Sequence, residues 1–468
     1  MNLPLLRRAA LPVVARSLGL LALLAAGGAL AQQRPGAAAA LVPDAAASAP
    51  ISLSARKVYE QARSQLLQIR TVLKGRASQT SVGSGFVVSR EGHILTNFHV
   101  VAEAALKPER HDLVYVTADG REAPLQILQL DVLHDLALLK AADAAAKPAA
   151  GVDDGSKGRI FDALAFRPDA QPLAQGERIY SLGNPLDVGF VVTEGTYNGL
   201  VRRSFYPQIF FGGALSAGMS GGPALDEQGR VVGINVARRV DGEQVSFLVP
   251  ASFAVALLAR GRDAAPIKSA AYGVVTDQVM QHQALLTERF IQQGWKADTH
   301  PRYTVPVPID QFMRCWGSSQ PSRTGGLDLE RSDCVMDTRI FVGDYTTGSI
   351  GVRHESYDGT KLGALRFASR YAASFRNEGF TRLSSEHQTK PQCQEDYVDR
   401  GGLPLRAVVC LRAYKKLPGL YDLSVLVATL DQPRAGVQGR FDVQGLNFAN
   451  AQKLAKHYLE AYGWTHQP

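Results

Sequence analysis

Gly218-Met219-Ser220-Gly221-Gly222-Pro223 is the stretch that decides the fold, because it predicts a tight turn presenting one serine among glycines. A serine hydroxyl attacks a carbonyl slowly unless a base removes its proton and N-H donors already face the developing oxyanion. Glycines allow the backbone dihedrals that would aim the amides of Gly218 and Ser220 at one point. The stretch therefore predicts a nucleophile and its oxyanion hole, against the alternative of a glycine-rich hairpin turn with an incidental serine.

Two upstream segments supply candidate partners for the serine. Residues 83–88 and 93–101 are typical of two apolar strands joined by a turn, which would place His99 at the end of the second strand. Asp135 directly precedes the apolar run 136–139, where a carboxylate needs a hydrogen bond such as an imidazole N-H can donate. The order His99, Asp135, Ser220 is that of chymotrypsin-type enzymes.

Other acids and histidines compete for these roles. His134 adjoins Asp135 and His93 lies in the same segment as His99, but an isolated histidine is more often an ordinary core or surface residue. Asp131 is interpreted as a loop acid and stays open as an alternative partner for His99.

Residues 52–262 resemble a trypsin-like serine protease of the bacterial HtrA (Deg) type. The resemblance implies an all-β, chymotrypsin-like double β-barrel that hydrolyses polypeptides without a cofactor. The matching segments are Gly83-Ser84-Gly85-Phe86, Leu95-Thr96-Asn97-Phe98-His99-Val100-Val101, Asp135-Leu136-Ala137-Leu138-Leu139, Gly183-Asn184-Pro185, and the serine turn followed by Gly229-Arg230-Val231-Val232-Gly233-Ile234-Asn235.

The chain also departs from related proteases. Met219 stands where HtrA proteins usually carry Asn, and Val100 stands where secreted animal trypsins carry Cys. The carboxylate-binding loop of a PDZ domain is not recognisable in the sequence after residue 262, although such domains usually follow an HtrA protease. The resemblance thus covers less than half of the chain. For the substrate pocket we expect Ala214, Asn235, Val236 and Ala237, whose small or apolar character favours a small aliphatic P1 residue.

The first 51 residues predict export. Residues 1–31 combine basic Arg7, Arg8 and Arg16 with an apolar run and an Ala29-Leu30-Ala31 cleavage site, as in a signal peptide cut after Ala31. An uncleaved anchor is the alternative. Residues 32–51 are an Ala/Pro-rich linker. Signal removal lowers the formal net charge from +8 to +5, which predicts no nucleic-acid partner. The mature protein would be periplasmic or secreted without a stable membrane anchor, in an oligomeric state that the sequence leaves open.

The four cysteines all lie in the second half of the chain. In an oxidising compartment an even number predicts two disulfides, although four cysteines allow three pairings. We favour Cys315 with Cys334 and Cys393 with Cys410, while free thiols remain an alternative. The cysteine spacing is not that of a zinc site, and we expect no metal.

The second half, residues 268–468, predicts an α+β accessory domain. Glycine-ended helices are expected over 284–295, 362–380 and 448–464, and strands over 338–342, 349–354, 408–415 and 421–429. A further helical spacing over 55–69 leads into the first barrel strand. Because a helix precedes each cysteine pair, we interpret the accessory half as a duplicated helix/hairpin unit; coincidence is the alternative.

Together these patterns predict an exported serine endopeptidase that acts on polypeptides through His99, Asp135 and Ser220. All of its catalytic groups precede residue 262, so we expect bond cleavage to need nothing beyond that point. Three alternatives remain: a protease-fold binding module without activity, a chaperone-like stress sensor, and an acyl hydrolase such as an esterase.

Overall fold

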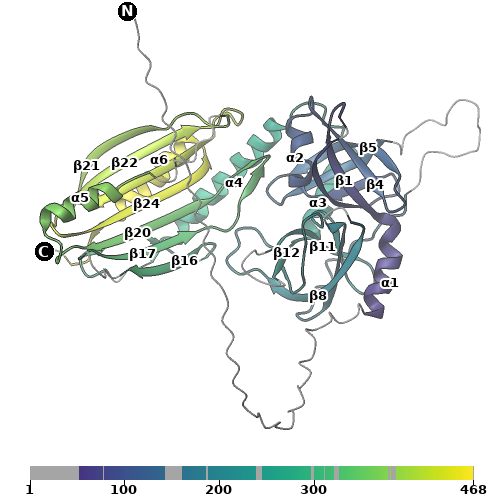
Figure 1. Ribbon diagram of the computed structural model, residues 1–468, viewed down its shortest axis with the longest axis horizontal. Helices are drawn as coiled ribbons and strands as arrows, with labels where there is room; N and C mark the ends of the chain where they lie inside the picture. Colours follow the sequence, from purple (N-terminus) through teal and green to yellow (C-terminus); the bar gives the residue numbers. More distant parts are fainter. Residues whose placement is uncertain are drawn as a thin grey trace, which may run out of the picture. The chain divides into compact units, whose positions relative to one another are not determined.

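The computed structural model in Figure 1 describes residues 52–76, 78–142, 161–185, 188–238, 245–296, 300–309, 311–320, 326–377, 380 and 386–466. The predicted signal peptide (1–31) and linker (32–51) lie outside the described residues. Across those described ranges, every helix is too short or too polar to cross a membrane.

The first barrel begins after helix α1 (Leu53–Ala62), whose N-terminus is capped by Ser52 accepting from the Ala55 amide at 3.0 Å. Its strands close in the order β1-β2-β3-β6-β5-β4. Helix α2 (Phe98–Leu106) follows the third strand. The strands are β1 (Leu66–Leu73), β2 (Gln79–Val87), β3 (His93–Thr96), β4 (His111–Thr117), β5 (Glu122–Asp131) and β6 (Leu136–Ala141).

The second barrel closes in the order β10-β11-β12-β9-β8-β7 and is followed by helix α3 (Ala251–Gly261), which contacts strands of both barrels. The predicted chymotrypsin-like double β-barrel is confirmed. The strands are β7 (Arg178–Gly183), β8 (Val191–Leu200), β9 (Ile209–Phe211), β10 (Pro223–Leu225), β11 (Val231–Arg238) and β12 (Ser246–Pro250).

The region after the barrels is α+β, as predicted, and its main element is one antiparallel seven-stranded sheet in the order β16-β17-β20-β24-β23-β22-β21. Helices α4 (Tyr272–Gln293) and α6 (Phe448–Glu460) pack on one face. Helix α5 (Ala364–Ser374) packs on the other. The sheet strands are β16 (Arg314–Gln320), β17 (Asp328–Val335), β20 (Ile350–Asp358), β21 (Gln392–Arg400), β22 (Leu403–Ala413), β23 (Tyr421–Thr429) and β24 (Ala435–Leu446).

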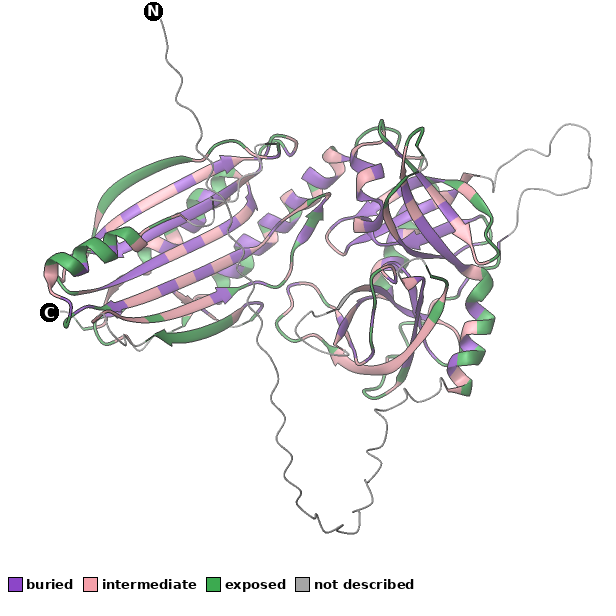
Figure 2. Cartoon of the chain, in the orientation of Figure 1, coloured by how far each residue is buried: buried purple, intermediate pink, exposed green. Residues whose placement is uncertain are grey.

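Three short strand pairs complete this region. Strand β18 forms a hairpin with β19, β13 pairs with β15, and β14 pairs with β25. Figure 2 shows alternating burial along the central strand β20, whereas the edge strand β21 is mostly exposed. The short strands are β13 (Trp295–Lys296), β14 (Tyr303–Thr304), β15 (Val307–Pro308), β18 (Ile340–Val342), β19 (Tyr345–Thr347) and β25 (Gly463–Trp464).

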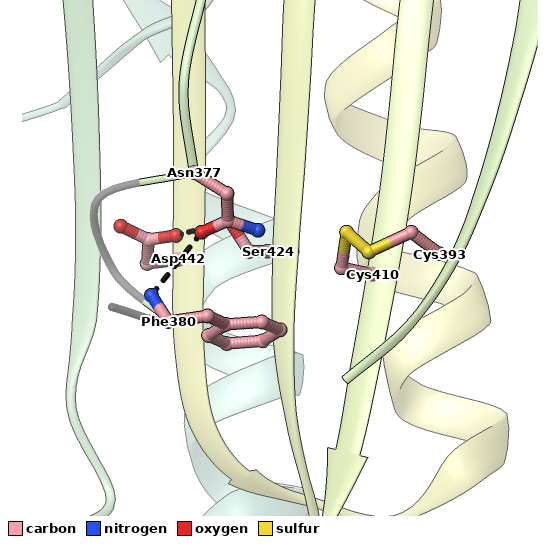
Figure 3. Close-up of a disulfide and its surroundings, with 6 residues drawn as sticks. All are labelled: Asn377, Phe380, Cys393, Cys410, Ser424 and Asp442. Atoms are coloured by element: carbon pink, nitrogen blue, oxygen red, sulfur yellow. Dashed lines mark hydrogen bonds between the residues drawn. A yellow bond between two sulfur atoms is a disulfide. The ribbon is translucent and has the colours of Figure 1, made fainter. Parts of the chain in front are cut away.

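Two disulfides join neighbouring strands of this sheet, and the favoured pairing is confirmed. Cys315 is bonded to Cys334 across β16 and β17, and Cys393 to Cys410 across β21 and β22. Each pair lies in direct register, with Cα atoms 4.0 Å apart. Figure 3 shows the second bridge near Ser424, whose hydroxyl donates to Asp442 at 2.6 Å.

Several predicted boundaries are wrong. Residues 66–69 belong to β1 rather than to a helix over 55–69, because an extended strand buries Leu67 and Ile69 in one core cluster and Leu66 in another. Helix α4 begins at Tyr272 rather than at 284, α5 covers only 364–374, and α6 ends at Glu460. Glycine does follow α4, where Gly294 has a φ of 68°. The duplicated unit stays a prediction, since the two disulfide hairpins occupy opposite edges of one continuous sheet.

The first barrel and the C-terminal region share one hydrophobic core. Val101 and Leu106 of helix α2 lie in the same buried cluster as Val279 of α4 and Ile340 and Val342 of β18. Barrel residues are therefore covered by segments beyond residue 262. The two halves are less separable than the sequence suggests.

We expect Ile340→Ala to lower the free energy of unfolding by about 2–5 kcal/mol, because it leaves a cavity in this shared core. Ile340 is 1% exposed. Leu365→Ala is the matched control, since Leu365 is 89% exposed and should change stability by no more than about 0.5 kcal/mol. Urea denaturation of both variants gives the measurement, and equal stabilities would contradict a shared core.

Candidate active site

Asp135 is hydrogen-bonded to the His99 segment through both its side chain and its backbone carbonyl. Nδ1 of His99 lies 2.6 Å from Oδ2 of Asp135, and the His99 backbone amide donates to Oδ1 at 2.8 Å. The Asp135 carbonyl accepts from the Phe98 amide at 3.1 Å and from the Asn97 side chain at 2.8 Å. Asp135 adopts a φ of 55°. The structure thus brings together the predicted histidine and acid.

His99 lies in the first turn of helix α2, so its predicted position at the end of a strand is wrong. Strand β3 ends at Thr96, and Asn97 is the extended residue that begins the helix. The β-branched pair Val100 and Val101 favours a strand locally. Burial overrides that preference, because both valines of the helix pack in the core cluster of the first barrel.

Burial alone would lower the pKa of His99, but the charge of Asp135 and its hydrogen bond raise this pKa above its ordinary value. The hydrogen bond to Asp135 requires the proton on Nδ1, which leaves Nε2 of neutral His99 as an acceptor. That tautomer is the one that a general base needs.

Ser220 lies in a turn in which three successive carbonyl groups, those of residues 218–220, accept hydrogen bonds from the protein. Oγ of Ser84 donates to the Gly218 carbonyl at 2.7 Å, and the Ser84 amide donates to the Ser220 carbonyl at 2.8 Å. Nδ2 of Asn235 donates to the Met219 carbonyl at 3.2 Å. By contrast, the amides of Gly218 and Ser220 donate to no acceptor within the described residues.

Two glycines of this turn are required by its geometry. Gly218 and Gly221 have φ values of 91° and 84°, in the region that other residues rarely adopt. A Cβ at Gly221 would lie 2.3 Å from the Ser84 carbonyl oxygen. The turn packs so tightly against β2 that the predicted role of glycine in shaping it is physically well founded.

Ser84 joins the two candidate catalytic segments. It accepts at Oγ from the Asn184 amide at 2.9 Å, and its carbonyl accepts from Oγ1 of Thr96 at 2.7 Å. Thr96 ends the strand that precedes His99, while the Ser84 amide and hydroxyl hold the serine turn. Among the described residues no hydrogen bond joins Ser220 to His99; the Ser220 hydroxyl donates to the Val236 carbonyl at 3.3 Å.

The competing histidines have structural contacts. Nε2 of His93 lies 2.9 Å from the Arg262 carbonyl, and burial lowers the pKa of His93. His134 lies 2.9 Å from Asp131 and stacks on Phe253 with ring centroids 3.7 Å apart. Neither histidine contacts Asp135 through its ring in the hydrogen bonds of the described residues, and no cluster there could hold a metal ion.

The predicted pocket residues lie in different environments. Ala214 is exposed, and Asn235 is fully buried, where it also donates to the Leu182 carbonyl at 2.9 Å. Val236 lines a cleft of about 520 Å³ beside Asp135, and Ala237 follows it in β11. The small aliphatic P1 preference remains a prediction.

This cleft contains residues that the sequence did not single out. Segments from both barrels and from the region after residue 262 line it, including Leu133, Tyr206, Phe247, Arg339 and Phe341. Ser84 was also missed as a positioning residue. Its Gly-Ser-Gly setting was the available signal, whereas nothing local in the sequence indicates that Phe341 approaches His99.

Comparison with known proteins identifies the barrel region. The family description "Trypsin-like peptidase domain" matches residues 83–234. This segment is thus similar to a trypsin-like peptidase domain. A probable periplasmic serine endoprotease, DegP-like, of Hahella chejuensis is 31% identical over 309 residues, covering 60% of each chain. A putative serine protease, HhoB, of Synechocystis is 33% identical over 181 residues, covering 37% of this chain and 38% of that protein.

The chain spans less than two thirds of the length of these relatives. The serine endoprotease of Yersinia pestis, a solved structure, matches 46% of this chain and 68% of its own at 21% identity, with a TM-score of 0.36. The predicted resemblance to HtrA-type proteases is confirmed by the curated relatives.

The hydrogen bonds of Ser84 to the serine turn predict that Ser84→Ala lowers activity. Ser84→Ala frees the Gly218 carbonyl, so the oxyanion turn loses its orientation and kcat should fall by a factor of about 10²–10³ while KM changes little. Ser78→Ala is the control, because Ser78 is exposed on the same hairpin. Steady-state peptide hydrolysis measures kcat and KM of both variants. An unchanged kcat for Ser84→Ala would contradict the role of Ser84 in holding the serine turn.

Proposed function

We propose that the protein is an exported serine endopeptidase that cleaves polypeptides through Ser220, His99 and Asp135. The observation that carries this proposal is the combination of the His99–Asp135 hydrogen bond with a serine turn whose Gly218 and Ser220 amides donate to no acceptor in the part of the chain that the structure describes. These are the base, its orienting acid, the nucleophile and the oxyanion donors of acyl transfer.

The proposed reaction begins when the Ser220 hydroxyl leaves the Val236 carbonyl and donates to Nε2 of His99. As Oγ attacks the scissile carbonyl, its proton passes to Nε2, and Asp135 stabilises the resulting imidazolium. The carbonyl oxygen becomes an oxyanion that accepts from the Gly218 and Ser220 amides. His99 then protonates the leaving amine, and a water molecule repeats the sequence to release the acyl group.

A periplasmic location is part of the proposal. It is supported by the signal-like first 31 residues and by the names of relatives that are called periplasmic endoproteases. A polypeptide substrate agrees with the same names. The binding-module alternative is favoured by one observation, the hydrogen bond of Ser220 to Val236 instead of His99.

Covalent labelling tests the nucleophile. Ser220→Ala should abolish both peptide cleavage and labelling by a fluorophosphonate, because the variant removes the only atom proposed to attack. The fold should persist, since the turn depends on glycine dihedrals and on backbone carbonyl contacts. Circular dichroism provides that control. Equal labelling of the variant and the parent protein would remove Ser220 from the proposal.

The pH dependence tests the base. Protonated His99 cannot accept the serine proton, so kcat/KM should fall as the pH drops through the pKa of His99, which lies above its ordinary value. Asp135→Asn should lower kcat by about 10⁴ by misorienting the imidazole. It should also move the acid limb to lower pH, because burial then acts on the His99 pKa without the opposing carboxylate.

Asp131→Asn is the matched control for this pair, because Asp131 contacts His134 and Arg260 rather than His99. We expect it to change kcat less than about tenfold. A larger effect of Asp131→Asn than of Asp135→Asn would reverse the assignment of the acid.

A further inference from the structure

The β18–β19 hairpin is fixed against the helix that carries His99. Side chains alternate between the two sides of a strand. Ile340 and Val342 are each 1% exposed and belong to the core shared with Leu106 of α2, whereas Phe341 is 38% exposed on the other side. Burial of its two neighbours therefore determines where Phe341 points.

Phe341 lies against the candidate base. Its ring centroid is 5.5 Å from that of His99, with the ring planes inclined at 45°. It also lines the cleft of about 520 Å³ beside Asp135, together with apolar side chains of the barrels such as Leu133 and Val236. The wall nearest the proposed chemistry thus comes from a residue well beyond the peptidase domain.

Further contacts hold the two sides of this cleft together. The Phe205 amide donates to Oγ1 of Thr338 at 3.4 Å, and Nη1 of Arg289 donates to the Phe205 carbonyl at 3.3 Å. The neighbouring Tyr206 hydroxyl lies 2.8 Å from Nδ1 of His282 in helix α4. The loop of the second barrel that lines the cleft is therefore attached to the C-terminal region at three points.

We propose that Phe341 is a specificity-determining residue, forming the apolar wall of the subsite that receives the substrate side chain beside His99. This inference rests on the proposed endopeptidase function and deepens it. The preferred substrate is an extended polypeptide with an apolar residue at that subsite, because Leu133, Val236 and Phe247 line the same cleft as Phe341. The same cleft also has charged lining residues: Arg314 pairs with Asp337 at 3.0 Å, and Arg203 and Arg339 lie along it too.

A phenylalanine side chain has no titratable proton, so we expect Phe341 to affect substrate selectivity and not proton transfer. An apolar pocket discriminates between side chains that differ by one or more methylene groups by factors of about 10–200. Removing one aromatic wall should therefore reduce the preference for an apolar over a glycine residue at one substrate position. It should leave the reactivity of Ser220 towards a small reagent unchanged.

The test compares the full chain with its Phe341→Ala, Phe341→Leu and Tyr397→Ala variants. Fluorogenic peptides vary each of the four residues before the cleaved bond, and kcat/KM is measured for leucine and for glycine at each position. Tyr397 is the matched control, since it is an aromatic residue that is 69% exposed on the edge strand β21. Fluorophosphonate labelling reports on Ser220 independently of peptide binding.

We expect Phe341→Ala to lower the leucine-to-glycine ratio about tenfold or more at one position only, with Phe341→Leu close to the parent protein and Tyr397→Ala unchanged. Labelling rates should agree within about twofold. An unchanged ratio in a labelled, active Phe341→Ala variant overturns the inference alone. A uniform rise in kcat/KM for every peptide also overturns it, because Phe341 would then obstruct the cleft. A parent protein that neither labels nor cleaves overturns the proposed function with it.

Discussion

The hydrogen bonds of Ser84 are the constraint on which the rest of the site depends. One residue of β2 donates through its amide to the Ser220 carbonyl and through its hydroxyl to the Gly218 carbonyl. Its own carbonyl accepts from Thr96, at the end of the strand before His99. The first barrel therefore positions the serine turn of the second. Because a buried polar group without a partner costs about 1–3 kcal/mol, these bonds hold the turn in one orientation.

In that orientation the backbone carbonyls and the backbone amides of the turn have different surroundings. Its carbonyls are turned into the protein, where Ser84 and Asn235 satisfy them, while the Gly218 and Ser220 amides have no acceptor among the described residues. Hydrogen bonds also fix the orientation of His99, because one carboxylate oxygen of Asp135 accepts from the His99 backbone amide and the other from its ring. The serine turn and the His99 ring are thus held before substrate arrives, whereas the Ser220 hydroxyl must still leave the Val236 carbonyl. A turn held in advance is the main requirement for electrostatic stabilisation of an oxyanion.

Local patterns selected the residues of the candidate site better than they predicted the architecture around it. The serine turn, His99 and Asp135 were found because each lies in a short motif with a mechanical reason for its residue types. The disulfide pairing was found because Cys315–Cys334 and Cys393–Cys410 are separated by 19 and 17 residues, a distance that a hairpin can close. The helix at His99 was missed, because Val100 and Val101 favour a strand and only packing against the barrel decides otherwise.

Long-range contacts account for the remaining failures. No pattern near residue 341 indicates that a hairpin of the C-terminal region packs on helix α2, since this depends on burial of Ile340 and Val342 in a core built by distant segments. For the same reason residue 262 looked like the end of a self-contained unit. The structure instead gives the barrels and the region after them a common core, and the cleft beside Asp135 has walls from both.

The most direct test of the account is a crystal structure of the full chain inactivated by a peptidyl phosphonate with an apolar residue next to the phosphonate group. The account predicts phosphorus bonded to Oγ of Ser220 and one phosphonyl oxygen within hydrogen-bond distance of the Gly218 and Ser220 amides. It also predicts the apolar side chain between Phe341 and Leu133. A phosphonyl oxygen pointing away from both amides, or a modified residue other than Ser220, would contradict it.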